Sequence, residues 1–333
     1  MILFNQPEYS FLKTDLHLGR NIIFLTYGGS YAYGTNVEGS DIDIRGCTLN
    51  RKADLLGMGN FEQVVDDRTD TTVYAFNKLL GLLINCNPNT IELLGCRPEH
   101  YFVLTPIGRQ LLDQRKMFLS RRAVNSFGGY AGQQLRRLEN ALAHDAYPAK
   151  VKERHIMGSC ENAMNSFPGR YRSFTPKQIR LSVGEAGGKP QVLADINMER
   201  VPLREFTGMM GELVEITRNY DKIHHRNKKK DDAHLNKHAM HLVRLYLMCL
   251  DILEKEEIVT YREADHDLLM DIRNGQYQKA DHTFNADFYD LLNDLEKRLD
   301  YAKQNTSLPE APDLPRIEAF QMEVNERVVR DEI

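Results

Sequence analysis

The sequence predicts an α/β domain over residues 1–119, followed by a mainly helical domain over residues 120–333. Short β-branched runs alternate with segments of helical periodicity in the first part of the chain. From residue 120 onward, most apolar patterns have helical spacing. A length of 333 residues is enough for two domains that each bury a core.

The composition is that of an ordinary globular protein, with 42% hydrophobic and 27% charged residues. The formal charge is −4, so any nucleic-acid contact must use a local basic patch. Five scattered cysteines without a CxxC pair indicate a reducing cytoplasm rather than a disulfide framework or a zinc site. Because we find no signal peptide and no apolar run that could span a bilayer, we expect a cytoplasmic protein without a membrane partner.

The first expected strand is the apolar run Ile22–Leu25, which is followed by Gly28, Gly29 and Ser30. Glycines let the backbone approach a ligand closely, and the N–H groups and the Ser30 hydroxyl suit a phosphate. A helical turn after Ser30 would direct its dipole at the same anion. The segment therefore predicts a phosphate-binding loop, with an ordinary strand-ending turn as the alternative.

An acidic pair, Asp41 and Asp43, follows Ser30 after ten intervening residues and begins an expected strand that continues to about Thr48. Alternation along a strand would place both carboxylates on one face and Ile42 in the core. The two Cα atoms would lie about 6.5 Å apart, close enough for the carboxylates to share one or two divalent cations. The alternative is a half-exposed strand with outward carboxylates, although aspartate is disfavoured in strands.

Asp70 is the third candidate metal ligand. It stands at the entrance of an expected strand at 71–74, which could neighbour the Asp41 strand. A metal that acidifies an acceptor hydroxyl normally needs such a further ligand. The alternative is a solvated aspartate in the turn after the expected strand at 61–65. Helices are expected around Leu12, Leu16 and Leu18, at 75–86 and at 106–115.

The second part of the chain is expected to be helical except for one hairpin and the loops. The expected elements are helices at 120–143 and 150–166, a hairpin of 179–183 with 192–196, helices from about Leu203, a basic loop at 224–230, and a linker at 305–315 before a terminal helix.

One helix of this part has a cationic stripe. At about 100° per residue, Lys237, His241 and Arg244 fall on one side of the helix and apolar residues on the other. Two permanent cations and a histidine suit a triphosphate better than a metal ion. A zinc site of His234, His238 and His241 is the weaker alternative because no Cys or HExxH motif accompanies it. A solvated charged face is the other alternative.

The order Gly29-Ser30, Asp41-x-Asp43 and Asp70 resembles the signature of the DNA polymerase beta superfamily of nucleotidyltransferases. The whole chain resembles the RlaP-like branch, a group of nucleotidyltransferases associated with RNA repair. The matching segments are 29–34, 40–46, 70–74, 87–94, 129–131, 237–245 and 272–275.

The resemblance implies an α+β nucleotidyltransferase domain with a small mixed sheet, followed by a helical domain that closes over the nucleotide. It implies that Asp41 and Asp43 hold two Mg²⁺ or Mn²⁺ ions, that Asp70 holds the catalytic one, and that Ser30 contacts the nucleotide's phosphates. The segment from Arg170 to Asp195 does not align with the family, so the acceptor stays open.

We therefore expect a Mg²⁺-dependent nucleotidyltransferase that moves NMP from an NTP such as ATP to an acceptor hydroxyl, with an RNA end as the acceptor. One alternative is a toxin-like transferase that attaches a nucleotide to a protein or a tRNA. The other is a non-catalytic module that binds nucleotide or RNA, against which the acidic trio argues.

Overall fold

The computed structural model describes residues 6–131, 149–165, 167–226, 232–280 and 282–333. Contacts divide the chain into two compact units. The first comprises Met1–Leu135, Ala239–Tyr277 and Ala286–Ile333, and the second comprises Arg136–His238 and Gln278–Asn285. The boundary expected at residue 119, between a catalytic and a nucleotide-closing half, stays a prediction.

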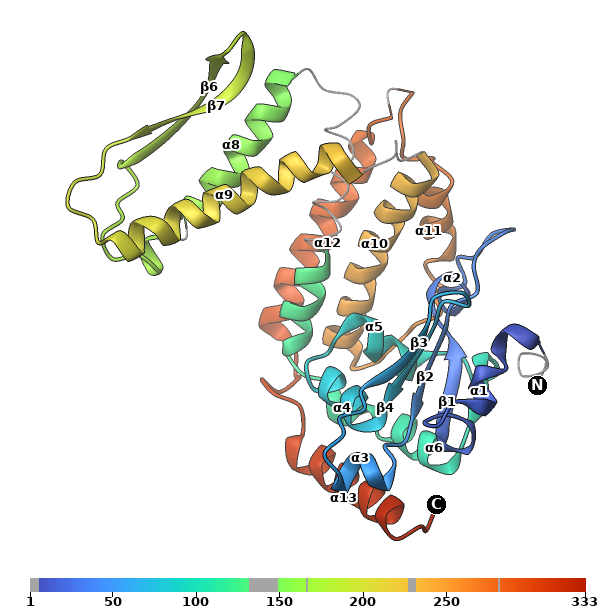
Figure 1. Ribbon diagram of the computed structural model, residues 1–333. Helices are drawn as coiled ribbons and strands as arrows, with labels where there is room; N and C mark the ends of the chain where they lie inside the picture. Colours follow the sequence, from blue (N-terminus) through green and yellow to red (C-terminus); the bar gives the residue numbers. More distant parts are fainter. Residues whose placement is uncertain (1–5, 132–148, 166, 227–231, 281) are drawn as a thin grey trace. The chain divides into compact units, whose positions relative to one another are not determined.

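The first unit is built on a mixed sheet of five strands within the described residues, in the order β3-β4-β2-β1-β5 (Figure 1). Strands β2 and β4 run parallel, and the other neighbouring pairs are antiparallel. This small mixed sheet with flanking helices confirms the predicted fold class. The strands are β1 (Ile22–Tyr27), β2 (Ile44–Thr48), β3 (Gln63–Asp66), β4 (Thr71–Ala75) and β5 (Tyr101–Leu104).

Helices of the first unit surround this sheet (Figure 1). They include α1 (Phe11–Thr14), α2 (Gly29–Tyr33), α3 (Lys52–Leu56), α4 (Phe76–Ile84), α5 (Pro88–Ile91), α6 (Pro106–Asp113), α11 (His266–Arg273), α12 (Ala286–Asn305) and α13 (Leu314–Val329). Residues 122–131 are also helical. Helix α10 (Asp232–Lys255) crosses the boundary between the units, and its residues from Ala239 onward belong to the first.

Helix α4 shows how the sequence positions these helices. Phe76, Leu79 and Leu83 recur at helical spacing and are fully buried, and α4 packs against β2 and β4. The C-terminal helix α13 packs on α3 and α4, with the Phe76 and Phe320 rings edge to face at 5.7 Å. The helix expected at 75–86 and the terminal helix are therefore confirmed.

The second unit contains the predicted hairpin and two long helices. Strands β6 (Ile179–Ala186) and β7 (Lys189–Ile196) pair antiparallel, and Gly187 and Gly188 turn the chain with φ values of 62° and 72°. Positive φ at both central residues is the hairpin geometry that glycine permits. The helices are α8 (Ala149–Asn165) and α9 (Leu203–Arg226). The unit's small core contains Met164, Phe167, Phe174, Ile179 and Met209.

Several expectations for local structure need correction. Strand β5 was not predicted, and the Leu16 side chain is 67% exposed instead of packing inward. Helix α9 continues to Arg226, so the first part of the expected basic loop is helical, while 227–231 lie outside the described residues. The helix expected at 120–143 is confirmed up to residue 131, and 132–148 also lie outside them. Within the described parts of the chain, no helix is both long enough and apolar enough to cross a bilayer.

Candidate active site

The ends of β1, β2 and β4 meet at one edge of the sheet. Asp43 directly precedes β2 and Asp70 directly precedes β4, and these strands pair in parallel with Ile44 opposite Thr71. The Ile44 N–H donates to the Asp70 carbonyl at 3.1 Å, and the Gly28 N–H donates to the Asp43 carbonyl at 2.8 Å. Backbone hydrogen bonds therefore hold the glycine loop and both aspartates side by side. This confirms that the Asp70 strand neighbours the acidic strand.

Asp41 is placed differently from what its spacing predicted. Strand β2 begins at Ile44 rather than at Asp41, and the Ile42 side chain is 41% exposed rather than in the core. The reason is that β1 ends at Tyr27, the partner of Ile44, so residues 41–43 have no ladder to join. The strand alternation that grouped Asp41 with Asp43 is therefore absent, and the metal role of Asp41 stays a prediction.

The Arg45 guanidinium lies between the carboxylates of Asp43 and Asp70. Its Nη2 is 2.9 Å from Asp70 Oδ1 and 3.5 Å from Asp43 Oδ1. Its Nη1 donates to the carbonyl oxygens of Ile44 and Asp70. Arg45 lies in the matching segment 40–46, but no role was predicted for it. The signal that could have found it is its place two residues after Asp43, in the strand that Asp43 directly precedes.

The glycines pack against this cluster. Gly29 has a φ of +55°, and a β-carbon on it would lie 1.7 Å from Asp43 Oδ2. A β-carbon on Gly28 would lie 2.8 Å from Arg45 Cγ. Ser30 follows in the first turn of α2, which confirms the expected helical turn, and it is buried. The two glycines thus make room for Asp43 and Arg45 in addition to exposing backbone N–H groups.

Helix α2 is tied to α10 through a buried carboxylate, Glu92. The Tyr33 hydroxyl donates to Glu92 Oε1 at 2.8 Å, and Arg244 Nη1 donates to Glu92 Oε2 at 3.0 Å. The Arg244 guanidinium also stacks on the Tyr33 ring, with its Cζ 3.6 Å from the ring centroid. Burial raises the pKa of Tyr33 well above its ordinary value, so the hydroxyl keeps the proton that it donates.

Two of the three residues of the predicted cationic stripe on α10, His241 and Arg244, belong to the first unit. Arg244 is only 4% exposed, and its pairing with Glu92 excludes the solvated charged face that was the alternative for this residue. His241 lies edge to face with the Tyr33 ring at 6.0 Å. Lys237 is exposed and belongs to the second unit. The structure therefore brings His241 and Arg244 to α2, and the role of Lys237 stays a prediction.

The carboxylates fit a hard divalent cation in part. Asp43 and Asp70 converge on one positive group, and carboxylate oxygens are the ligands that Mg²⁺ and Mn²⁺ accept. Among the described residues, however, no group of three or more Asp, Glu, His or Cys side chains is arranged to hold a metal ion. Asp43 and Asp70 thus lie together beside Arg45, and the metal-binding role of Asp41, Asp43 and Asp70 stays a prediction.

A second cation lies beside the loop that precedes the acidic pair. Arg273, in the last turn of α11, approaches Ser40 Oγ with its Nη2 at 3.5 Å. Its Nη1 is buried without a hydrogen-bond partner in the part of the chain that the structure describes, and burial lowers the pKa of this guanidinium. A buried donor without an acceptor costs free energy, so Nη1 is suited to receive one. Arg273 lies in the matching segment 272–275, but no role was predicted for it from the sequence.

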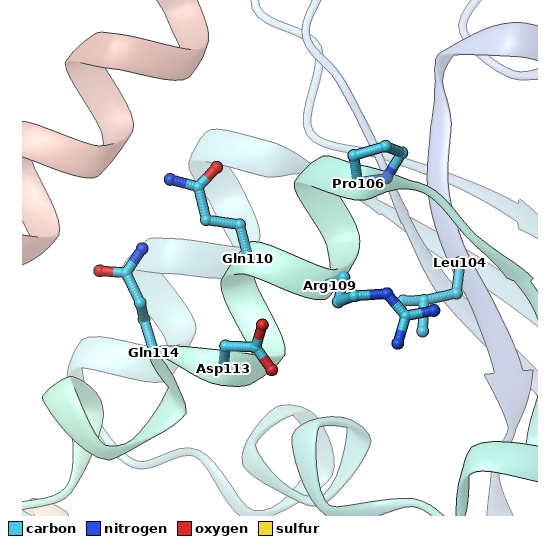
Figure 2. A pocket seen from close by; sticks show the side chains of 6 residues that line it. All are labelled: Leu104, Pro106, Arg109, Gln110, Asp113 and Gln114. Carbon is cyan, nitrogen blue, oxygen red and sulfur yellow. The ribbon is translucent and has the colours of Figure 1, made fainter.

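The carboxylates are separate from two pockets on the surface of the first unit. Figure 2 shows a pocket of about 480 Å³, lined by Leu104, Pro106, Arg109, Gln110, Asp113 and Gln114, chiefly from α6. A larger one, of about 1090 Å³, lies among α1, α3 and the C-terminal residues. None of the predicted site residues lines either pocket.

One comparison with known proteins matches the part of the chain that forms this edge of the sheet. The model of the family described as RlaP, RNA repair pathway DNA polymerase beta family, matches residues 9–155. This range contains Gly29, Ser30 and all three aspartates, so the resemblance inferred from these motifs is confirmed. No curated protein and no solved structure matches the chain.

Proposed function

Since residues 9–155 are of the RlaP type, we propose that this protein transfers a nucleoside monophosphate from an NTP to an acceptor hydroxyl, with an RNA end as the acceptor. One observation carries the proposal. Asp43 and Asp70 directly precede neighbouring parallel strands beside the glycine loop, and both carboxylates pair with the Arg45 guanidinium. Carboxylates next to a phosphate-binding loop are the arrangement that phosphoryl and nucleotidyl transfer need.

Asp43 and Asp70, with Asp41 on the adjoining loop, would hold Mg²⁺ or Mn²⁺, which would acidify the acceptor hydroxyl and offset charge on the phosphates. In the reaction, the acceptor oxygen forms a bond to the α-phosphorus and loses its proton, and the bond to the departing pyrophosphate breaks. The two carboxylates stand at the ends of paired strands, so the backbone fixes their spacing. This rigidity favours a site that is organised before the substrate arrives.

Four residues are proposed to bind or position the nucleotide. Gly29 and Ser30 would accept a phosphate at the start of α2, and Arg273 would donate its unpartnered Nη1 to the triphosphate. His241 would contact the nucleotide from α10, beside Tyr33. A substitution at any of these four residues should raise the Kd of the NTP more than it lowers the rate of the chemical step.

Arg244 has a different proposed role because Glu92 already engages its guanidinium. By stacking on Tyr33 and sharing Glu92 with it, Arg244 would hold α2, and with it the glycine loop, in place. It is therefore a positioning residue. The nucleotide contact of Lys237 stays a prediction.

The test is transfer of label from each α-labelled NTP, with Mg²⁺, to total RNA and total protein. The wild-type chain should label RNA, and Asp43→Asn should lower the rate on the order of 100-fold, equivalent to about 3 kcal/mol of transition-state stabilisation. Asp67→Asn is the matched control because this exposed turn residue makes the same change of charge. Circular dichroism would verify that both variants fold.

The label also separates this proposal from its alternatives. Label on protein would indicate the toxin-like transferase. NTP binding without labelling of either pool would indicate a binding module. Equal transfer by wild type and Asp43→Asn would remove the carboxylates from the mechanism and contradict the proposed site.

A further inference from the structure

We propose that Arg45 is a built-in counter-ion that competes with the divalent cation for Asp43 and Asp70, and so sets the affinity of the metal site. The inference rests on the proposed function only for the expectation that a divalent cation binds these carboxylates. Arg45 lies in the matching segment 40–46, and the proposal gives it a role that was not predicted from the sequence.

The first support is the position of the guanidinium. Its Nη2 lies 2.9 Å from Asp70 Oδ1 and 3.5 Å from Asp43 Oδ1, so one nitrogen serves both carboxylates. Two carboxylates that share a site repel one another unless a positive charge lies between them. Arg45 supplies that charge from the strand that Asp43 precedes.

The second support is that the guanidinium is anchored as well as attracted. Nη1 donates to the carbonyl oxygens of Ile44 and Asp70, which ties the group to the backbone of both strands. The Arg45 side chain is 23% exposed, and its Cγ packs so closely on Gly28 that a β-carbon there would lie 2.8 Å from it. These four contacts hold the guanidinium in one position, where it competes with a divalent cation for the two carboxylates.

The third support is electrostatic. A divalent ion bound to Asp43 and Asp70 would lie within a few ångströms of the guanidinium, and like charges at that distance repel strongly where water is partly excluded. The ion must therefore displace the guanidinium and break its ion pairs. That free energy is subtracted from the binding of the ion, so wild-type affinity is lower than the carboxylates alone would give.

The test is a titration of the full chain with Mn²⁺, in which calorimetry or electron paramagnetic resonance measures the bound ion. Arg45→Gln should bind Mn²⁺ about tenfold more tightly than wild type, because both the competitor and its repulsion are gone. Arg68→Gln is the matched control. Arg68 lies in the turn before Asp70 and pairs with Asp66, so its loss changes the net charge equally without touching the site.

A double variant locates the effect. In Asp43→Asn, the additional change Arg45→Gln should no longer produce the full gain, because the shared carboxylate is missing. Unchanged or weaker Mn²⁺ binding by Arg45→Gln would overturn the proposal. A gain of the same size in Arg68→Gln, or one that persists fully without Asp43, would overturn it as well.

Thermal unfolding separates a counter-ion from a merely structural arginine. Without Mn²⁺, Arg45→Gln should melt below wild type, and saturating Mn²⁺ should raise its Tm more than that of wild type. If Arg45→Gln does not fold, Arg45→Lys keeps the charge but loses the fork of donors, and it should bind Mn²⁺ with intermediate affinity. Mn²⁺ affinity equal to wild type in Arg45→Lys would then contradict the proposal. Failure of nucleotide transfer with these Mn²⁺ effects intact would count against the proposed function alone.

Discussion

Gly29 and Asp43 are packed so closely that a β-carbon on the glycine would stand 1.7 Å from the Asp43 Oδ2 atom. The backbone of Gly29 is also left-handed, with a φ of +55°, which side chains other than glycine adopt at a cost. Glycine is therefore required at this position for two separate reasons. The phosphate-loop glycine and the metal-site carboxylate form one packing unit, so a change in the first must move the second.

Gly29→Ala should lower both stability and metal affinity. The left-handed backbone costs about 1–2 kcal/mol with a side chain, and the clash adds about 1–3 kcal/mol unless Asp43 moves. Movement of this carboxylate should weaken Mn²⁺ binding. Urea unfolding gives the stability change, and a Mn²⁺ titration gives the change at the site.

Gly39→Ala is a control that separates the two causes. Gly39 has a φ of +79°, but a β-carbon there would have nothing within 4 Å. This variant should lose about 1–2 kcal/mol from backbone strain alone and should bind Mn²⁺ like wild type. Equal effects of the two substitutions on Mn²⁺ binding would show that the contact between Gly29 and Asp43 has no role.

Glu92→Gln should destabilise the first unit strongly. It leaves the Arg244 guanidinium buried without its counter-charge, which costs about 3–5 kcal/mol for a pair of this kind. Adding Arg244→Met should recover part of the loss because the remaining buried charge is then removed. Urea unfolding of the two single variants and the double variant measures this coupling.

An exposed ion pair provides the comparison for the buried pair of Glu92 and Arg244. Arg298 and Glu254 form a pair in which the arginine side chain is 51% exposed, so Glu254→Gln should cost less than about 1 kcal/mol. A similar loss for Glu92→Gln would mean that the buried contact between Glu92 and Arg244 does not hold α2 in place.

Most of the fold was predictable because its signals are local. Strand β1, helix α4 and the hairpin of β6 and β7 follow from apolar periodicity and glycine turns within one segment. Strand β5 was missed because its four residues are all half-buried and show no alternation. The predicted start of β2 was wrong because β2 begins only where it finds pairing partners, at the end of antiparallel β1 and at the start of parallel β4.

The parts of the site that depend on a residue's position along a strand were predictable, whereas contacts between distant segments were not. Asp70 was expected beside the acidic strand because it opens a strand of its own, and this is confirmed. The ion pair of Arg45 and Asp70 joins residues 25 positions apart, and that of Glu92 and Arg244 joins residues 152 apart. A helical projection can group Arg244 with other cations, but it contains no information about a carboxylate on another element.

Acid should destabilise the first unit partly through His100. Burial lowers the pKa of this histidine below its ordinary value of 6.5, and nearby Arg97 acts in the same direction while Glu99 opposes it. Since the folded state binds the proton less readily than the unfolded state, the contribution of His100 is fully present above about pH 6.5 and is lost as the pH falls through the lower folded-state pKa.

His100→Gln should therefore flatten the dependence of unfolding free energy on pH between about 7.5 and 5. Urea unfolding at several pH values measures the slope. His266→Gln serves as the control for the loss of a histidine because the His266 side chain is 43% exposed. If His100→Gln keeps the wild-type slope, the acid sensitivity arises from other groups.

Arg273 provides the last prediction, which concerns the nucleotide rather than the fold. Its buried Nη1 has no acceptor among the described residues, so a phosphate oxygen that reached it would form a charge-assisted hydrogen bond without breaking one first. Such a bond contributes about 1.5–3 kcal/mol. The loss of Arg273 should therefore weaken binding of an NTP and leave the protein as stable as before or more stable, because a buried unpaired donor is removed.

Arg273→Gln should raise the Kd of a fluorescent NTP analogue by about tenfold or more, measured by fluorescence anisotropy in Mg²⁺. Arg115→Gln removes the same charge from an exposed position and should leave this Kd unchanged. The dependence on phosphate number adds a sharper criterion, since the effect should shrink for the nucleoside monophosphate if Arg273 contacts the outer phosphates. An unchanged Kd together with raised stability in urea would show that the buried guanidinium is only a structural cost and does not bind the triphosphate.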